Sequence, residues 1–447
     1  MFNNKITTIV ENNKKITLWS LALPLLIQTL LSRLINTIGI VILSGYSETL
    51  LTATSVSTQV INLPFTIIES LITGTVILAS VELGRNNKTS AASIFGCGTI
   101  VSLVLSVLVG AIVALFAKEF TASMNLIGTT AKLCQDYLFL EALIILPIRI
   151  LFTTFQKYLI CNGYSKIVPI SSVTTGCINA GLAYILLYAI KLPSDFVIEG
   201  LALKTAFAWS IGLLICIIAF LRTKVPFKLN FNFSTAFNII KIGLPAGMCF
   251  ISYNFANTIT TSFLGSIGEF AIDAKIYINN IVEYVPLVFW AIASANSVIM
   301  GRLRGMGKFD DMKILFKQNL KLAIIINGSL SLLCFIFRLP LLSLFTDAPE
   351  VLALSSAILI IDIPLEIARG INHLSEHSLN PNGDVKTTLV TSVISTWLFS
   401  VLTCYILCVP MNLGLVGLWI GFLCNESSKA IIYVLRWRSE KWKKTKI

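Results

Sequence analysis

The sequence predicts an all-α polytopic membrane protein with twelve transmembrane helices in two pseudo-symmetric six-helix lobes. The 447 residues are 55% hydrophobic and 13% charged, and the mean hydropathy is +0.84. The cores of a multidomain soluble protein do not give so apolar a composition. Apolar runs of about 20 residues recur, each long enough for a helix to cross ~30 Å of hydrocarbon. The second half of the chain also repeats landmarks of the first, which predicts the two lobes.

Twelve candidate spans are found with a window of about 19 residues. They cover residues 17–42, 54–80, 92–117, 132–156, 167–190, 198–221, 236–264, 273–300, 314–337, 350–377, 387–408 and 414–435. The first span resembles a secretory signal but continues past Arg33 without a small-residue cleavage site, so we expect it to be retained. Most lysines and arginines fall in the termini and in the loops on their side. The positive-inside rule therefore places both termini in the cytoplasm. We expect a multi-pass protein of a bacterial inner membrane.

The chain repeats itself at a shift of 221 residues, as the match of Leu23-Pro24 with Leu244-Pro245 shows. Gly84 and Gly305 follow the same shift. An even number of spans in each half gives both halves one orientation, so we expect the lobes to be related by an axis along the membrane normal. The predicted lobes are residues 1–221 and 236–447, the second ending in a basic cytoplasmic tail. A basic cytoplasmic linker at 222–235 joins them.

Four stretches carry a family resemblance: LALPLLIQTLL at 21–31, GYSETLLTATSVSTQVINLP at 45–64, KIGLPAGMCFISY at 241–253, and GLVGLWIGFLCNESSKAIIYVLRWRSEKW at 414–442. They resemble the multidrug and toxic compound extrusion (MATE) transporters, and the GYS segment is most similar to the NorM branch. The resemblance covers essentially the whole chain. It implies a V-shaped pair of six-helix bundles that exports organic cations in exchange for sodium or protons.

Two acids that are usual in this family are absent here. Counting back from the GYS segment puts Gly39 where the first span usually carries an acid, with Asn36 one turn away. Counting on from the second Leu-Pro pair reaches Tyr253 and Asn254, where the NorM branch carries an acid. The resemblance therefore makes Asn36, Tyr253 and Asn254 candidate site residues, and it leaves the coupling ion open.

The tenth span holds the densest group of charges, within DIPLEIARGINHLSEH at 362–377. At about 100° per residue, Asp362, Glu366, Arg369, His373 and Glu376 fall on one face of a helix. This helix is longer than the hydrocarbon that it crosses, but either end can protrude and still leave Asp362 and Glu366 inside the membrane. An ionisable group at that depth costs roughly 3 kcal/mol and needs a partner or water. We therefore predict that Asp362, Glu366, Arg369 and His373 couple ions or substrate.

Polar residues inside other spans are further candidates, namely Arg33, Glu69, Asn179 and Glu283. Arg33 and Glu69 are expected to pair between the first two helices, either as a structural ion pair or as a substrate contact. Glu283 lies near the middle of the eighth span and suits a cation cavity. Glu141 and Arg149 flank Pro147 in the fourth span, where a helix kink is one interpretation of them.

The function that these features favour is secondary antiport, in which small cationic or amphipathic organic compounds are exported by alternating access. One alternative is a flippase or exporter of a lipid-linked or polar metabolite, with Arg33 and Arg369 binding an anionic headgroup. A remote alternative is an intramembrane enzyme with His373 as base. It is disfavoured because twelve spans in two equal lobes exceed what such chemistry requires, and we expect no enzyme.

Protons are the favoured coupling ion, and sodium is possible. Sodium needs several fixed oxygen ligands, whereas adjacent carboxylates such as Asp362 and Glu366 resist double ionisation and hold one proton between them. The ten cysteines show no C-x-x-C spacing, and the sequence has no phosphate-binding loop, H-E-x-x-H or G-x-G-x-x-G motif, so no metal site and no cofactor are expected. The net charge of +12 follows from topology, and we expect the basic tail to touch anionic lipid rather than nucleic acid. The expected partners are a small organic substrate and the lipid bilayer, with the protein acting as a monomer.

Overall fold

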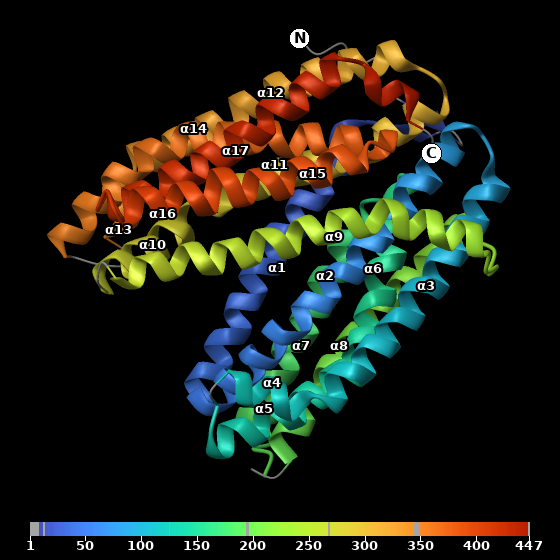
Figure 1. The fold of residues 1–447 in the computed structure, drawn as a ribbon. Coiled ribbons are helices and arrows are strands. Elements are labelled where there is room, and N and C mark those ends of the chain that lie inside the picture. The colour runs from blue at the N-terminus through green and yellow to red at the C-terminus, as the bar shows by residue number, and fades with distance from the viewer. Residues whose placement is uncertain are drawn as a thin grey trace. The chain divides into compact units, whose positions relative to one another are not determined.

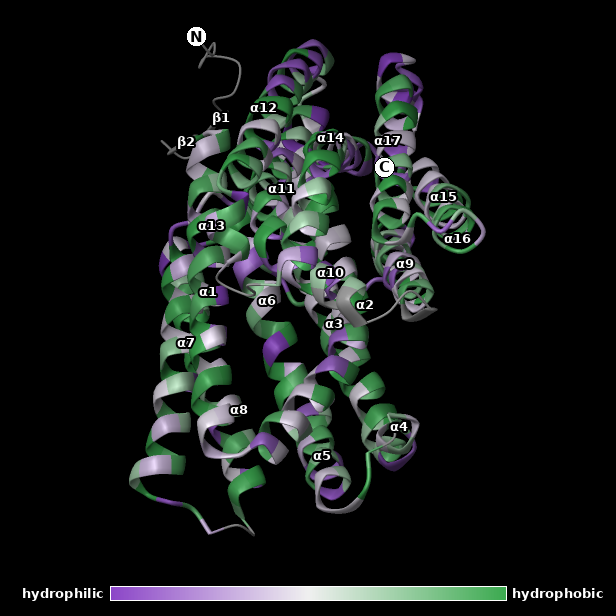
Figure 2. Cartoon of the chain, turned by 90° about the vertical axis from the view of Figure 1, so that its left-hand side faces the viewer, coloured by the Kyte–Doolittle hydropathy of each residue, from purple (hydrophilic) through white to green (hydrophobic). Residues whose placement is uncertain are grey.

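A computed structural model describes residues 9–11, 14–124, 126–193, 196–266, 269–343 and 348–445. Within these ranges, twelve helices are long and apolar enough to cross a membrane, which confirms the predicted spans and the all-α fold (Figure 1). Figure 2 shows hydrophobic residues along the length of the helices. Ahead of the helices, β1 (Ile9–Glu11) and β2 (Lys14–Ile16) form a short antiparallel hairpin in which Ile9 pairs with Ile16.

The chain packs as two compact units, which are described separately. The first unit covers Leu23–Gly247. It holds most of α1 (Leu18–Tyr46), then α2 (Glu48–Gly84), α3 (Lys88–Leu115), α4 (Ala117–Ser123), α5 (Gly128–Leu140), α6 (Leu146–Cys161), α7 (Ile167–Tyr184), α8 (Val197–Thr223) and the start of α9 (Phe233–Ser262). Two π-helical turns, Glu141–Ile145 and Ile185–Ala189, follow α5 and α7.

The second unit covers Met1–Ala22 and Met248–Ile447. Besides the hairpin and the end of α9, it holds α10 (Glu269–Val282), α11 (Tyr284–Gly305), α12 (Phe309–Ile336), α13 (Arg338–Leu342), α14 (Pro349–Leu379), α15 (Val385–Ser395), α16 (Thr403–Cys408) and α17 (Gly414–Arg438). A π-helical segment, Thr396–Leu402, joins α15 to α16, and short 3-10 turns lie at Phe263–Ser266, Asn380–Asn382 and Lys441–Lys444. The predicted lobe limits at residues 221 and 236 remain a prediction.

A widened helical turn marks the fourth span. The N–H of Leu146 bonds to the carbonyl of Glu141, five residues back, at the end of the π-helical turn. Pro147 follows at once and has no N–H to donate, so the regular α-helical bond at this point is missing. Single π-helical turns of this kind are frequent at functional sites. The turn leaves the carboxylate of Glu141 buried against α2, where it accepts a hydrogen bond from Thr58.

The start of α9 lies in very close contact with α2 of the first unit. A Cβ atom added to Gly74 would lie 2.8 Å from the carbonyl oxygen of Ile239. One added to Gly243 would lie 2.6 Å from the Cα of Leu71. Only glycine allows two helix backbones to approach so closely. These two glycines therefore fix where α9 crosses α2.

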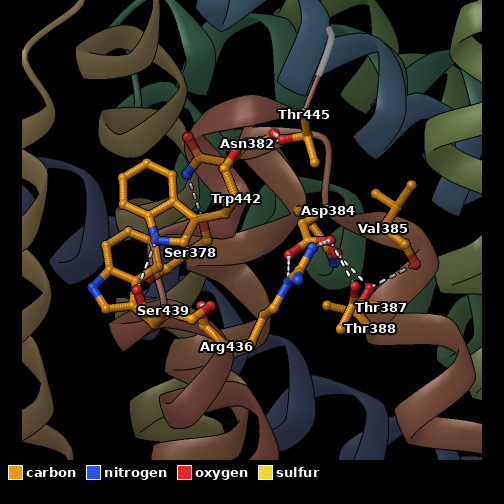
Figure 3. Close-up of polar contacts among 12 residues, drawn as sticks. Ser378, Asn382, Asp384, Val385, Thr387, Thr388, Arg436, Ser439, Trp442 and Thr445 are labelled. Carbon is orange, nitrogen blue, oxygen red and sulfur yellow. Dashed lines mark hydrogen bonds and ion pairs between the residues drawn. The ribbon is translucent and has the colours of Figure 1, made fainter.

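The C-terminal tail folds back on the second unit. Trp442 is fully buried and stacks on Trp437 with ring centroids 4.4 Å apart, and Trp437 stacks in turn on Phe316 of α12 at 4.5 Å. Arg436 makes a two-pronged ion pair with Asp384, at 2.6 and 3.0 Å (Figure 3). The tryptophans of the tail pack against helices of their own unit, and contact of its basic residues with anionic lipid stays a prediction. The tail thereby joins α17 to α12 and to the start of α15.

Gly370 on α14 makes room for the side chain of Asn327 on α12. A Cβ atom added to Gly370 would lie 1.8 Å from Nδ2 of Asn327. We expect Gly370→Ala to lower the free energy of unfolding by about 1–3 kcal/mol, because overpacking forces side chains and backbone to shift. The matched control is Gly181→Ala on α7, where an added Cβ would meet nothing within 4 Å.

Urea or thermal unfolding of the purified protein measures this difference. Adding Asn327→Ala to the Gly370→Ala protein removes the clashing group and should recover most of the loss. If it recovers none, the crowding at this contact is not the cause.

Candidate functional site

The tenth span supplies two fully buried carboxylates. Pro349 and Glu350 begin α14 with the residue types that suit a first helical turn, and the helix continues through Pro364. Asp362 and Glu366 are four residues apart and therefore share one face. Their exposed fractions are 1% and 0%. The predicted acids thus lie inside the second unit, away from its surface.

The contacts of these two acids leave one negative charge unbalanced. Trp419 of α17 donates its indole N–H to Oδ1 of Asp362 at 3.2 Å. Arg369 forms an ion pair with Oε1 of Glu366, one turn further along α14. Oδ2 of Asp362 and Oε2 of Glu366 are buried without a hydrogen-bond partner in the described part of the chain. Two carboxylates therefore share one cation, and each retains a free oxygen.

A second charged layer lies between α14 and α17. Asn372 donates to Oε2 of Glu426 at 2.6 Å, and Asn425 donates to its other oxygen at 3.4 Å. Lys429 is buried one turn beyond Glu426, with its Nζ 5.7 Å from the ring centroid of Tyr253 on α9. Of these five residues, only Tyr253 was predicted from the sequence. The signal for Asn425, Glu426 and Lys429 was the polar run NESSK inside the last apolar span, whereas Asn372 lies in the charged stretch of the tenth span.

The remaining predicted residues of the second unit take different positions. His373 lies on α14 near the charges of Glu426, Arg369 and Lys429. Tyr253 lies near the same group of charges. Asn254 is exposed and donates to the carbonyl of its own helix at Phe250, at 2.8 Å. 

Glu283 lies exposed at the junction of α10 and α11. Its backbone N–H bonds to the carbonyl of Asn279 at 3.0 Å.

The face of α12 that packs on α14 adds further polar atoms. Both amide atoms of Asn327 and the hydroxyl of Ser331 are buried without a hydrogen-bond partner among the described residues. Cys334, one turn further along α12, lies near Asp362 and Glu366. The two acids are therefore bordered by α12 as well as by α17.

The first unit contains a cavity of about 540 Å³. Its walls come from α1, α2, α7, α8 and the fourth span, and two predicted residues, Asn36 and Asn179, line it. Among the described residues, the charged side chains that line it are Glu141, Arg149 and Lys204. The cavity thus brings the charges of the fourth span together with Lys204 of the sixth span, which was not predicted from the sequence.

Glu69 of α2 forms an ion pair with Lys157 of α6 at 3.0 Å. Lys157 also donates to Thr73 of α2 at 2.8 Å. The sequence predicted Arg33 as the partner of Glu69, whereas the ion pair in the structure is formed with Lys157. This pair ties α2 to α6 within the first unit.

Comparison with known proteins places the chain in a family. A family model described as MatE matches residues 24–185 and again 245–406, two segments that begin 221 residues apart and confirm the predicted repeat. The uncharacterized transporter YisQ of Bacillus subtilis is 28% identical over 437 residues, which are 96% of this chain and 95% of YisQ. A probable multidrug resistance protein NorM of Thermotoga maritima is 19% identical over 428 residues, covering 95% and 92% of the two chains.

Solved structures show the same fold. A crystal structure of a MATE protein in its bent conformation superposes with a TM-score of 0.88 at 19% identity, over 96% of both chains. This agreement confirms the twelve-helix architecture with its two six-helix lobes. The chain belongs to the MATE family, whose members are multi-pass membrane transporters and not enzymes.

Proposed function

We propose that this protein exports small cationic or amphipathic organic compounds in exchange for protons. The family match supports efflux as the direction of transport. The buried cluster of Asp362, Glu366 and Arg369 is the proposed coupling site.

One observation carries the choice of the proton. Asp362 and Glu366 lie one turn apart on α14. A single cation, Arg369, follows one turn after Glu366 and forms an ion pair with it. A net charge of −1 in a buried site is unfavourable, and one bound proton removes it. Each acid has an oxygen without a partner, so either can accept that proton. A cationic group of the substrate would compete with the proton for the same carboxylates. This competition by itself would couple export of the substrate to uptake of a proton.

Sodium is the rival ion, and a specific feature favours it. Oδ1 of Asn327 and Oγ of Ser331 on α12 are also buried without partners among the described residues. Together with the free carboxylate oxygens they offer the oxygen-rich surroundings that a hard cation prefers. We nevertheless favour the proton, because a proton needs one oxygen whereas sodium needs several.

The path of the proton to the cytoplasm is proposed to follow the α14–α17 interface. His373 lies next along α14 after Arg369 and near Glu426. Histidine changes its charge within the physiological pH range when its surroundings allow it, which suits a relay. The protein is proposed to act as a monomer in a bacterial inner membrane, with both termini in the cytoplasm.

A flippase that binds an anionic headgroup through Arg369 receives less support, because Glu366 already neutralises that guanidinium.

Efflux from cells that lack their own multidrug pumps tests the proposed function. A panel of cationic, zwitterionic and anionic fluorescent dyes is loaded, and expression of this chain should lower the retention of at least one of them. That export should disappear when Asp362→Asn and Glu366→Gln are combined, at an unchanged protein level. Export that survives the double change, or no export of any dye, would contradict the proposal.

A further inference from the structure

The cavity of the first unit holds more positive than negative charge. Arg149 and Lys204 are its two cations and Glu141 is its one carboxylate, among the residues that the structure describes. None of the ion pairs in the described part of the chain includes either cation. Charges at membrane depth pair with one another or with backbone carbonyls. Arg149 interacts with Glu141 and Glu69 at longer range, and Lys204 bonds to the carbonyl of Asn179. With two cations and one carboxylate in its described lining, the cavity is left with a positive charge that suits an anion from outside the chain.

The direct contacts that orient Arg149 are with neutral groups. Its guanidinium carbon lies 3.6 Å from the ring centroid of Phe65 and 5.6 Å from that of Trp209. Its NH1 donates to Oδ1 of Asn62 at 3.2 Å. A guanidinium has five N–H donors, so this arrangement orients the group and leaves donors for an anion. Trp209 lines the cavity beside it and offers an aromatic surface for an apolar body.

Lys204 is also oriented by a neutral residue. Its Nζ donates to the side-chain oxygen of Asn179 at 2.6 Å and to the backbone carbonyl of the same residue at 3.2 Å. The hydroxyl of Thr205, which bonds to the carbonyl of Leu201 at 2.7 Å, also lies 3.3 Å from this side-chain oxygen of Asn179. An ammonium has three donors, so one is left.

The cavity lacks an acid at a place where there is space for one. Gly39 of α1 lines the cavity, and a Cβ atom added to it would meet nothing within 4 Å. The carboxylate that is present, Glu141, is buried and accepts its hydrogen bond from Thr58 at 3.2 Å. The chain therefore places glycine where an acid would fit without a clash, and the cavity keeps its excess of positive charge.

We propose that this cavity binds an anionic oxygen group of the transported compound, a carboxylate or a phosphate, through Arg149 and Lys204. An aromatic or apolar body attached to that group packs beside Trp209. The volume of about 540 Å³ suits a compound of drug size. The inference rests on the proposed export function and narrows its substrates to zwitterionic amphipathic compounds, whose anionic group binds here and whose cationic group competes at Asp362 and Glu366.

The test is a binding measurement on the full chain in nanodiscs of neutral phosphatidylcholine. The probes share one aromatic body and differ in charge: 3-phenylpropionate, 2-phenylethyl phosphate, 3-phenylpropylammonium and methyl 3-phenylpropionate. We expect both anions to bind about 10-fold or more tightly than the ester and the ammonium, because charge-assisted hydrogen bonds are the strong ones. Equal or tighter binding of the ammonium or the ester, or no binding of either anion, would overturn the inference.

Variants locate the binding site. Arg149→Gln and Lys204→Gln should each weaken anion binding by roughly 10- to 100-fold and leave the ester unchanged. Arg149→Lys keeps the positive charge and should keep part of the preference for the anions over the ester. This variant therefore distinguishes the effect of a lost charge from a loss of folding. Gly39→Asp should lower anion affinity and raise that of the ammonium. Arg222→Gln, at the exposed end of α8, is the control that should change nothing. Unchanged anion binding in both cavity variants also overturns the inference.

Phosphatidylglycerol in the nanodiscs distinguishes the two sources of an anionic group. If it displaces 3-phenylpropionate from the unaltered chain, a lipid headgroup is a ligand of the site. If it does not, the ligand is a soluble compound, and either result agrees with the proposed chemistry. No ion gradient is used in this binding assay. A negative result would therefore overturn the anion site and leave proton-driven export to be tested by the transport measurement.

Discussion

Replacing Glu366 with glutamine is expected to reduce gradient-driven export by about 100-fold or more. A positioned side chain that takes and gives a proton typically contributes 10²–10⁴-fold to the step that it serves. Glutamine fills nearly the same volume but cannot carry the proton, and it leaves Arg369 without its carboxylate partner. The initial rate of dye export from energised membrane vesicles measures the loss. Asp362→Asn should act in the same direction, since Asp362 belongs to the same buried pair.

A matched control distinguishes coupling from the loss of any ion pair of this kind. Glu82 and Arg85 form a glutamate–arginine pair with the same three-residue spacing as Glu366 and Arg369. The Glu82 pair lies at the end of α2, where the side chain of Arg85 is 50% exposed. Surface pairs of this type contribute 0–1 kcal/mol or so. Glu82→Gln should therefore leave export unchanged, and an equal loss in both variants would refute the role assigned to Glu366.

Replacing Arg369 with glutamine is expected to destabilise the protein by about 3–5 kcal/mol. Removing one member of a buried ion pair leaves the other charge without compensation in a medium of low polarity. Glu366 is fully buried, and Asp362 lies one turn away with a charge of the same sign. The unfolding midpoint in urea, measured on the purified protein in detergent, reports the change.

A double variant tests the cause of that loss. When Arg369→Gln and Glu366→Gln are combined, no unpaired charge remains at this contact, so most of the stability should return. Export should stay absent in the double variant, because the proton carrier is gone. Additive losses of stability would show that the two side chains do not act as a pair.

Helical periodicity allowed the sequence to predict the three residues of the proposed coupling site that lie on α14. Asp362, Glu366 and Arg369 are spaced by four and three residues in one apolar span, and such spacing places them on a single face. Their burial and the Glu366–Arg369 ion pair follow from that placement. This part of the site lies within one helix, where sequence distance and spatial distance are related.

The contacts that α17 makes with α14 depend on packing between helices that are distant in sequence. Trp419 is 57 residues from Asp362, and Glu426 is 54 residues from Asn372. No local pattern indicates which face of α17 meets α14. The same holds for Lys204, whose partner Asn179 belongs to a different span. The sequence marks such residues only as polar groups inside apolar runs, and it does not tell which of them share a cavity.

The most direct test of the central claim uses proteoliposomes that contain the purified chain and a dye that it exports. One set of vesicles carries a pH gradient at equal sodium on both sides, and another carries a sodium gradient at equal pH. We expect dye transport to follow the pH gradient, to ignore the sodium gradient, and to lose its dependence on pH in Glu366→Gln but not in Glu82→Gln. Transport that follows the sodium gradient at fixed pH and ignores the pH gradient at fixed sodium would contradict it.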